Sequence, residues 1–509
     1  MKRVLSVLLC IVMIFGISSV AFSAYEGENR LPILMIEGRG PTSEIWDGDG
    51  NVLYPFNIDK KGVAKAVAQC VPLLSYALAT GNYDPWVDRF VEEMGQYYAP
   101  IIADKDGTLP QGTYLKGERN GENGFLNYFH GIDYLFRYDW RRSPVDIAGD
   151  LNKYIKAIKA ETGASKIGVV GRCMGANVLS AYLEQFGCDD VDTVIYYTST
   201  ANGTYAATNS FCGTLSVDAE ALVDYVEKND LLEDAVLSEF IRALINSVDS
   251  IGGVNGITDF ATKFLEKVYP HLSPKLLLST YAAFPSFWAL VDSDKFEDAK
   301  KFVFSGREEE YKNYIKLIDK YHYDVQEKLE TILDECVKKG VRVASVTKYD
   351  TASYPFFKNA KELGDNTVTV KAAAFGGTCA EFGKVLSDEY LASADMKYVS
   401  SDHMIDASTC HFKDTTWFVK DINHGYYPYC IDQLMRAICN SEKPMTVFDN
   451  ENYPQFLKYD EASETIAALT DKPTDSSEAK PGFIASLKKL ISAFVKLVLK
   501  LFEKLGNKK

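Results

Sequence analysis

The chain has 509 residues and a net charge of −15, and 47% of its residues are hydrophobic and 13% aromatic. This composition excludes disordered tails, collagen-like chains and small disulfide-stabilised proteins, and it provides a large core, in about three domains or in one large α/β domain with insertions. The excess of acidic side chains argues against nucleic acid as a partner, because phosphate binding needs clustered Lys and Arg.

Residues 1–23 have the composition of a secretory signal peptide. Two basic residues precede an uncharged run over 4–20, and the small residues Ala21 and Ser23 form the pattern that a signal peptidase recognises. We expect cleavage after Ser23, so that the protein is secreted or associated with the cell surface. An uncleaved membrane anchor is the alternative.

Residues 24–216 alternate short apolar runs with helical periodicity, as in the first part of an α/β core with a mostly parallel sheet. The first buried strand is expected over 31–36, ahead of a glycine-rich turn at 37–40. Pro32 indicates either an edge strand or the start of the strand, because proline cannot donate to a ladder. Further elements are expected in chain order: strand 132–137, a helix that stops at Gly163, strand 166–170 and strand 191–197.

The sharpest local signal is the run Gly171-Arg172-Cys173-Met174-Gly175, between strand 166–170 and a helix expected over 176–186. This context is that of a nucleophile elbow, G-x-S-x-G, with Cys173 in place of serine. The glycines let the strand and the helix approach closely, and the turn exposes its central side chain. A helix N-terminus favours the thiolate, so Cys173 is the candidate nucleophile; a buried structural cysteine is the alternative.

Residues 217–339 show helical patterns without clear strands, which predicts a helical cap over one end of the sheet. Strand signals return over 341–346, 368–370 and 415–419. Residues 340–469 would therefore complete the α/β core.

A nucleophile needs a base and an acid, which in this type of fold follow it in chain order on loops after late strands. His424, one of six histidines, fits the base best, because it follows the strand expected over 415–419 and precedes a new helix. For the acid we favour Asp402, which follows a strand-like run, with Asp406 as the alternative. Either aspartate could instead be a turn or cap residue.

The oxyanion donors would be two backbone N–H groups, those of Met174 beside the nucleophile and of Arg39 in the early glycine-rich turn. Backbone donors impose little on side-chain identity, so this prediction depends on the fold. A plain surface charge is the alternative for Arg39. The site as a whole calls for no cofactor and no metal.

The chain ends in a linker-like segment, 470–482, and a basic amphipathic helix expected over 483–509, with seven lysines and one glutamate. The two ends carry +2 and +6, which leaves −23 for residues 24–482. Such a helix suits an anionic membrane or envelope surface. Docking on the acidic body and self-association are the alternatives.

These features together resemble the lecithin:cholesterol acyltransferase-like branch of the α/β-hydrolases over roughly residues 31–200 and 340–440. The resemblance rests on these features: the turn at 37–40, Tyr138-Asp139-Trp140-Arg141 followed by Ser143, Thr162-Gly163, the elbow, and the pair Asp402 and His424. It implies an α/β-hydrolase fold with a helical lid, and esters of fatty acids or similar acyl groups that are hydrolysed or transferred. The chain departs from the family pattern at four positions: Glu37, Arg172, Cys173 and Ala176.

Cysteine parity bears on the nucleophile. Removal of residues 1–23 leaves nine of the ten cysteines, and an odd number leaves one thiol free if the others pair. The alternative is that none pair.

The sequence predicts an exported acyl-ester hydrolase with a Cys173, His424 and Asp402 triad that acts on an acyl-ester or lipid substrate. Acyl transfer by the same site, and a non-catalytic surface-binding protein on a hydrolase scaffold, are the alternatives.

Overall fold

The computed structural model describes residues 30–39, 43–57, 60–116, 132–218, 221–222, 224–225 and 253–473. The predicted signal peptide, the basic helix over 483–509, most of the linker and part of the predicted cap lie outside these residues. Among the described helices, none combines the length and the apolar character that a membrane crossing requires.

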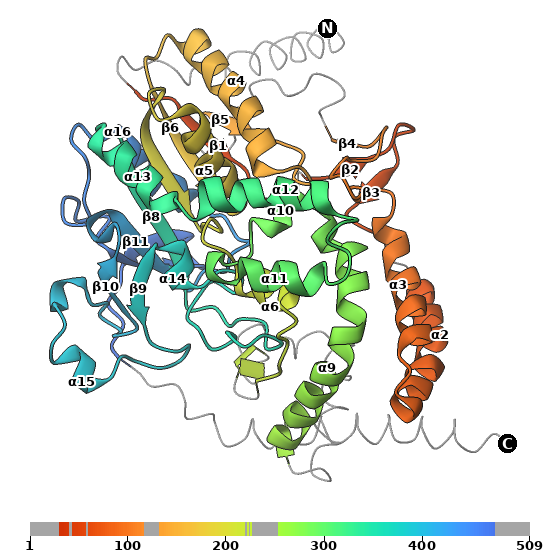
Figure 1. Ribbon diagram of the computed structural model, residues 1–509. Coiled ribbons are helices and arrows are strands. Elements are labelled where there is room, and N and C mark those ends of the chain that lie inside the picture. The colour runs from red at the N-terminus through yellow and green to blue at the C-terminus, as the bar shows by residue number, and fades with distance from the viewer. Residues whose placement is uncertain are drawn as a thin grey trace, which may run out of the picture.

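An eight-stranded sheet lies at the centre of the described part of the chain (Figure 1). Its strand order is β13-β12-β11-β8-β7-β6-β1-β5, and every neighbouring pair is parallel except β12 and β13. Helices flank it, so the predicted α/β class with a mostly parallel sheet is confirmed. The bounds are β1 Ile33–Ile36, β5 Tyr134–Phe136, β6 Ile167–Arg172, β7 Val191–Tyr197, β8 Arg342–Tyr349, β11 Thr416–Lys420, β12 Phe456–Asp460 and β13 Thr465–Ala468.

The two faces of the sheet are buried by different helices. Alternation along β1 sends Leu34 and Ile36 into a large core with α4 (Pro144–Thr162), α5 (Gly175–Phe186) and α13 (Leu329–Lys338). Ile33 and Met35 point to the opposite core, against α16 (Tyr429–Asn440). Each such fully buried side chain contributes about 1.5–3 kcal/mol. β1 is an interior strand, so Pro32 is explained by its place just before the strand.

Local sequence sets the ends of α4. The hydroxyl of Ser143 accepts a hydrogen bond from the amide of Val145, and Pro144 occupies the first turn, where its missing N–H costs nothing. At the other end Gly163 adopts the left-handed conformation at φ 71°. The predicted stop of this helix at Gly163 is therefore confirmed.

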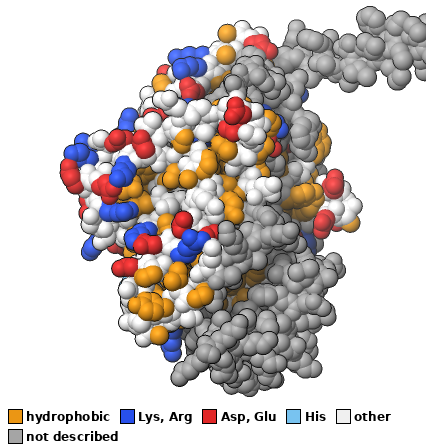
Figure 2. All heavy atoms as spheres, turned by 90° about the vertical axis from the view of Figure 1, so that its right-hand side faces the viewer, with side chains coloured by type: hydrophobic (Ala, Val, Ile, Leu, Met, Phe, Trp, Pro, Cys, Tyr) orange, Lys and Arg blue, Asp and Glu red, His pale blue; other side chains and the backbone are white. Residues whose placement is uncertain are grey.

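A group of helices packs to one side of the sheet. α2 (Lys60–Thr80) and α3 (Asp84–Tyr98), which the sequence patterns did not predict, lie side by side and share a small core with α9 (Gly253–Leu278) (Figure 1). Seen from that side, the described surface carries hydrophobic side chains among acidic and basic ones (Figure 2).

The predicted cap, 217–339, divides between two places. α9 lies beside α3, and α11 (Phe296–Val303) packs on α9 (Figure 1). α10 (Pro285–Trp288) packs on α12 (Lys312–Tyr321), which in turn packs on α4, and α13 packs on α5 and β8. The predicted cap from α12 onward therefore belongs to the layer that covers the sheet.

Shorter elements complete the described chain. The strand predicted over 368–370 is wrong, because the Thr369 hydroxyl caps a short helix there. The strand-like run 397–399 is instead part of a 3₁₀ turn. The short elements are β2 Ile45–Trp46, β3 Val52–Tyr54, β4 Tyr114–Leu115, β9 Gly376–Cys379, β10 Ile405–Cys410, α6 Tyr205–Phe211, α14 Val370–Ala373, α15 Asp388–Leu391, η2 Tyr281–Ala283, η3 Ser293–Lys295, η4 His322–Gln326, η5 Met396–Tyr398 and η6 Lys413–Thr415.

Candidate active site

Cys173 occupies the sharp turn between β6 and α5. Its φ of 52° is in the left-handed region, which a residue with a side chain occupies at a cost and which is common at functional sites. The Cys173 amide donates to the carbonyl of Tyr197 at the end of β7, and the Cys173 carbonyl accepts from the amide of Ala176. The thiol is half-buried. The turn thus fixes the thiol at the carboxyl edge of the sheet, next to the start of α5.

Two glycines allow the close approach around this turn. A Cβ added at Gly175 would lie 2.2 Å from the carbonyl oxygen of Ile36 in β1. A Cβ added at Gly38 would lie 2.7 Å from the Cβ of Cys173. Contacts this short do not occur between real atoms, so the backbone geometry of the site requires glycine at both positions.

His424 lies beside Cys173 on the loop after β11, and the two side chains shift each other's pKa. Burial raises the pKa of the Cys173 thiol, but the charge and hydrogen bond of His424 and the amide of Met174 outweigh it and lower that pKa from its usual value. Burial lowers the pKa of His424, but the charges of Asp365 and Cys173 raise it to about 10. Each side chain therefore favours the charged form of the other, a thiolate beside an imidazolium.

The contact between the two groups is a loose one. The Nε2 of His424 is buried and makes no close hydrogen bond to a described residue, although its interaction with the sulfur contributes to both pKa shifts. Catalytic hydrogen bonds are often long before substrate binds. Nε2 is thus the atom of His424 that remains for proton transfer.

The acid beside His424 is Asp365, on the loop after β8. Its Oδ2 lies 2.8 Å from Nδ1 of His424, and its backbone carbonyl accepts the His424 amide at 2.9 Å. Its Oδ1 accepts the amides of Thr367 and Val368 at 3.1 and 2.9 Å. The carboxylate is 1% exposed. Held at both oxygens, it fixes the orientation of the imidazole.

Asp402, the favoured acid of the sequence analysis, lies elsewhere. Its carboxylate accepts hydrogen bonds from Ser400, Tyr349 and Lys420, with the Lys420 ammonium at 2.8 Å. This buried ion pair ties the segment before β10 to the end of β11. The prediction that Asp402 orients His424 is corrected, because the Nδ1 of His424 is bonded to Asp365.

Asp406, the alternative acid, is also engaged away from His424. It accepts the Tyr390 hydroxyl and the amide of Ser408, both at 2.8 Å. It lies in β10, whose antiparallel partner is β9. Its role is that of a residue that stabilises a turn and a strand pair, which was the other interpretation of both aspartates.

Of the two predicted oxyanion residues, Met174 adjoins the thiol, and Arg39 follows Gly38, which packs against Cys173. Met174 begins α5, and the hydrogen bond from its amide helps to lower the pKa of Cys173. The side chain of Arg39 is not a plain surface charge. Its guanidinium lies 4.7 Å from the ring centre of Tyr54 and 4.8 Å from that of Trp140, and it donates to the Tyr54 hydroxyl.

A buried cation lies behind the histidine loop. The Lys348 ammonium donates to the carbonyls of Asn423, His424 and Tyr426 at 3.2, 3.2 and 2.6 Å. Arg172, next to the nucleophile, donates to the carbonyl of Gly425 at 3.3 Å. Two cations from β8 and β6 therefore hold the backbone of one loop.

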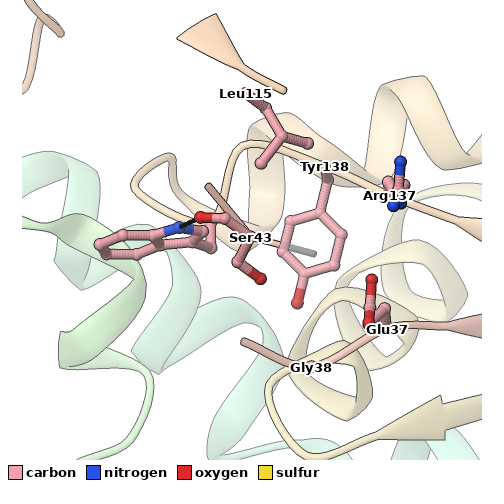
Figure 3. Close-up of a pocket in the computed structure, with 7 residues that line it drawn as sticks. Glu37, Gly38, Ser43, Leu115, Arg137 and Tyr138 are labelled. Atoms are coloured by element: carbon pink, nitrogen blue, oxygen red, sulfur yellow. Dashed lines mark hydrogen bonds between the residues drawn. The ribbon is translucent and has the colours of Figure 1, made fainter. Parts of the chain in front are cut away.

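A small hollow lies beyond Gly38, which packs against Cys173 (Figure 3). Gly38 and Tyr138 line it, and the ring of Tyr138 stands between Ser43 and Arg137 with its hydroxyl toward Gly38. Burial first, and then the charge of Cys173, raise the pKa of Tyr138. The volume is about 200 Å³ including open solvent, below the roughly 300–1,000 Å³ of typical ligand pockets.

The cysteines do not follow the parity argument. All nine from Cys70 to Cys439 are free thiols. A free Cys173 is therefore not the remainder of paired cysteines. Nor do histidine, cysteine, aspartate and glutamate side chains gather in groups of three or more that could hold a metal ion within the described ranges.

Sequence reasoning missed Asp365 and Lys348. Asp365 lies in Gly364-Asp365-Asn366-Thr367, whose composition is typical of a turn in which aspartate accepts the amide two residues later. This turn was not recognised, because the residues directly after it, 368–370, were wrongly predicted to form a strand. Lys348 lies in a strand otherwise identified by apolar residues, and no sequence pattern marks a lysine that points at backbone carbonyls. Compared with known proteins, the chain matches no family model and no curated protein.

Proposed function

We propose that this protein is an acyl-ester hydrolase of the α/β-hydrolase type, in which Cys173 is the nucleophile, His424 the base and Asp365 the acid. One observation carries the proposal. A thiol of lowered pKa, a histidine of raised pKa and a buried carboxylate meet at one edge of the parallel sheet, after β6, β11 and β8. This edge is where open parallel α/β sheets place their sites.

The proposed reaction has two halves. The Cys173 thiolate attacks the carbonyl carbon of the ester, and the amides of Met174 and Arg39 stabilise the negative oxygen that forms. The bond to the alcohol breaks, the alkoxide takes the proton from Nε2 of His424, and an acyl thioester remains on Cys173. Water then attacks the thioester and gives its proton to His424, and the thiolate leaves.

The direct test compares turnover of short- and long-chain p-nitrophenyl esters by the wild type and the Cys173→Ala variant. We expect the variant to lose activity by at least about 10³-fold, since nothing else in the site replaces the nucleophile. Cys212→Ala is the matched control, because Cys212 is also a half-buried thiol but burial raises its pKa to about 11. Equal rates for wild type and Cys173→Ala would end the proposal and favour the non-catalytic alternative.

The same thioester could also pass its acyl group to an alcohol. Product analysis with and without added long-chain alcohol separates the two outcomes. A dominant ester product would make the protein an acyltransferase with the same triad. Export to the cell surface, proposed from residues 1–23 alone, is tested separately by N-terminal sequencing of the mature protein.

A further inference from the structure

Lys348 is a buried cation whose partners all belong to the loop that carries His424. The side chain lies in β8 and the residue is 1% exposed. Its ammonium has three protons to donate, and it has three carbonyl acceptors, those of Asn423, His424 and Tyr426. No carboxylate among the described residues forms an ion pair with it. One side chain thus bonds to three of the four backbone carbonyls of segment 423–426.

The surroundings make this arrangement costly unless it has a use. The pKa of Lys348 is lowered to about 7, because burial and the charge of Arg172, which lower it, outweigh the charges of Asp365 and Cys173, which raise it. The face of the Tyr197 ring, 4.8 Å away, also favours the ammonium. An apolar side chain in this strand would avoid the cost of burying a charge. The lysine is therefore explained by what it holds.

Other contacts also hold this segment: the Asn423 side chain accepts the amide of Tyr426 at 3.0 Å, and the hydroxyls of Tyr426 and Tyr459 lie 3.1 Å apart. The loop leaves β11 through Asp421, which has a φ of 63°. The His424 amide bonds to Asp365, and Arg172 bonds to the carbonyl of Gly425. Among the side chains that contact this segment, Lys348 bonds to three of its carbonyls at once. Its loss would leave three carbonyls of the loop without this donor.

We propose that Lys348 is a positioning residue, which fixes the 423–426 loop so that the imidazole of His424 stays between Asp365 and Cys173. This inference rests on the proposed triad. The ammonium touches neither the thiol nor a reacting atom. It acts through the backbone of the base, and its removal lets the histidine move away from the sulfur.

The test measures the pH dependence of Cys173 alkylation by iodoacetamide, with peptide mass spectrometry, in Lys348→Met, Lys348→Arg and Lys420→Met. Lys420 is the matched control, since it is a buried lysine at the end of the adjacent strand but bonds to Asp402 instead of the loop. In Lys348→Met we expect the inflection to rise to about 8.5 or above, the value of an ordinary thiol, with labelling at pH 6.5 at least about tenfold slower. Lys420→Met should lower thermal stability but keep the wild-type inflection.

Lys348→Arg keeps the charge and should restore most of the wild-type profile. Hydrogen exchange of the peptide over 421–428 should be faster in Lys348→Met than in wild type or Lys420→Met. A folded Lys348→Met with the wild-type inflection would contradict the proposal, and so would a raised inflection with unchanged hydrogen exchange, since the charge of Lys348 also acts directly on Cys173. So would misfolding of both Lys348 variants, since it would show that the lysine supports the whole fold. If the wild type hydrolyses no ester but Lys348→Met still shifts the inflection, the positioning role stands and the hydrolase proposal falls.

Discussion

At the residue scale, the site depends on two opposite charges that stabilise each other against burial, which disfavours both. His424 could be predicted from the sequence, because histidines are few and this one follows a clear strand. The acid could not, since several aspartates follow late strands and only the folded chain shows which one reaches Nδ1. Asp402 looked suitable because it follows a strand-like run, but that run is part of a 3₁₀ turn, and the partner of its buried carboxylate is Lys420.

The assignment of the acid predicts opposite effects for two aspartates. Asp365→Ala should lower kcat by at least about 10²-fold, because His424 loses the carboxylate that orients it and raises its pKa. Asp402→Ala should leave kcat within about twofold but lower stability by about 3 kcal/mol, since it breaks a buried ion pair. Ester turnover and urea unfolding measure the two effects. A large loss of kcat in a folded Asp402→Ala would reverse the assignment.

The charge pair also predicts a pH profile. The pKa of Cys173 is lowered and that of His424 is raised to about 10, so the thiolate and the imidazolium coexist from the thiol pKa up to about pH 10. Alkylation of Cys173 should therefore reach its maximum rate at a lower pH than that of an ordinary thiol, whose pKa is about 8.5, and then stay nearly independent of pH up to about 10. In His424→Ala only burial and weaker influences remain, so the thiol pKa rises and labelling should grow about tenfold per pH unit. If the labelling rate of the wild type rose with pH as steeply as that of His424→Ala, the pairing would be refuted.

At the element scale, the strands of the large sheet were largely predictable because each is a short apolar run after a turn. Pattern failed where one side chain overrides it: Thr369 caps a helix inside an apolar stretch. It also failed for α2 and α3, whose shared core with α9 depends on residues almost two hundred positions apart. The turn that carries Cys173 was predictable, because a G-x-C-x-G motif between a strand and a helix implies a close approach of the two that only glycine allows.

The close packing of β1 against α5 predicts a strong effect at one glycine and the opposite effect at another. Gly175→Ala should destabilise the protein by about 1–3 kcal/mol or more, because the new methyl meets the carbonyl of Ile36. Gly149→Ala, inside α4 with open space around it, should stabilise by about 0.5–1 kcal/mol. Urea unfolding of the two variants measures both changes in stability. Equal effects at the two glycines would mean that α5 does not press on β1 as described.

At the scale of the whole molecule, charge is divided between an acidic body and a basic end. Residues 24–482 carry −23, while residues 483–509 carry seven lysines. Lysines near an anionic membrane surface contribute about 1 kcal/mol each. The tail is therefore a proposed surface anchor that is independent of the chemistry at Cys173.

Removal of residues 483–509 should abolish binding to anionic phosphatidylglycerol vesicles and leave turnover of soluble esters unchanged. A full-length variant with Lys488, Lys489, Lys496 and Lys500 changed to Gln tests the contribution of the positive charges separately from that of the apolar residues of this segment. Neutral phosphatidylcholine vesicles are the control, and added salt should weaken binding. Vesicle sedimentation is the measurement. Undiminished binding after the deletion would disprove the anchor.

The central claim is that Cys173 forms an acyl-enzyme. The measurement is mass spectrometry of the wild type quenched in acid shortly after mixing with p-nitrophenyl butyrate. The proposal predicts a butyryl group on the peptide that contains Cys173, released by neutral hydroxylamine and absent from Cys173→Ala. Turnover that continues with no acyl group on Cys173, or with the group on another residue, would contradict it.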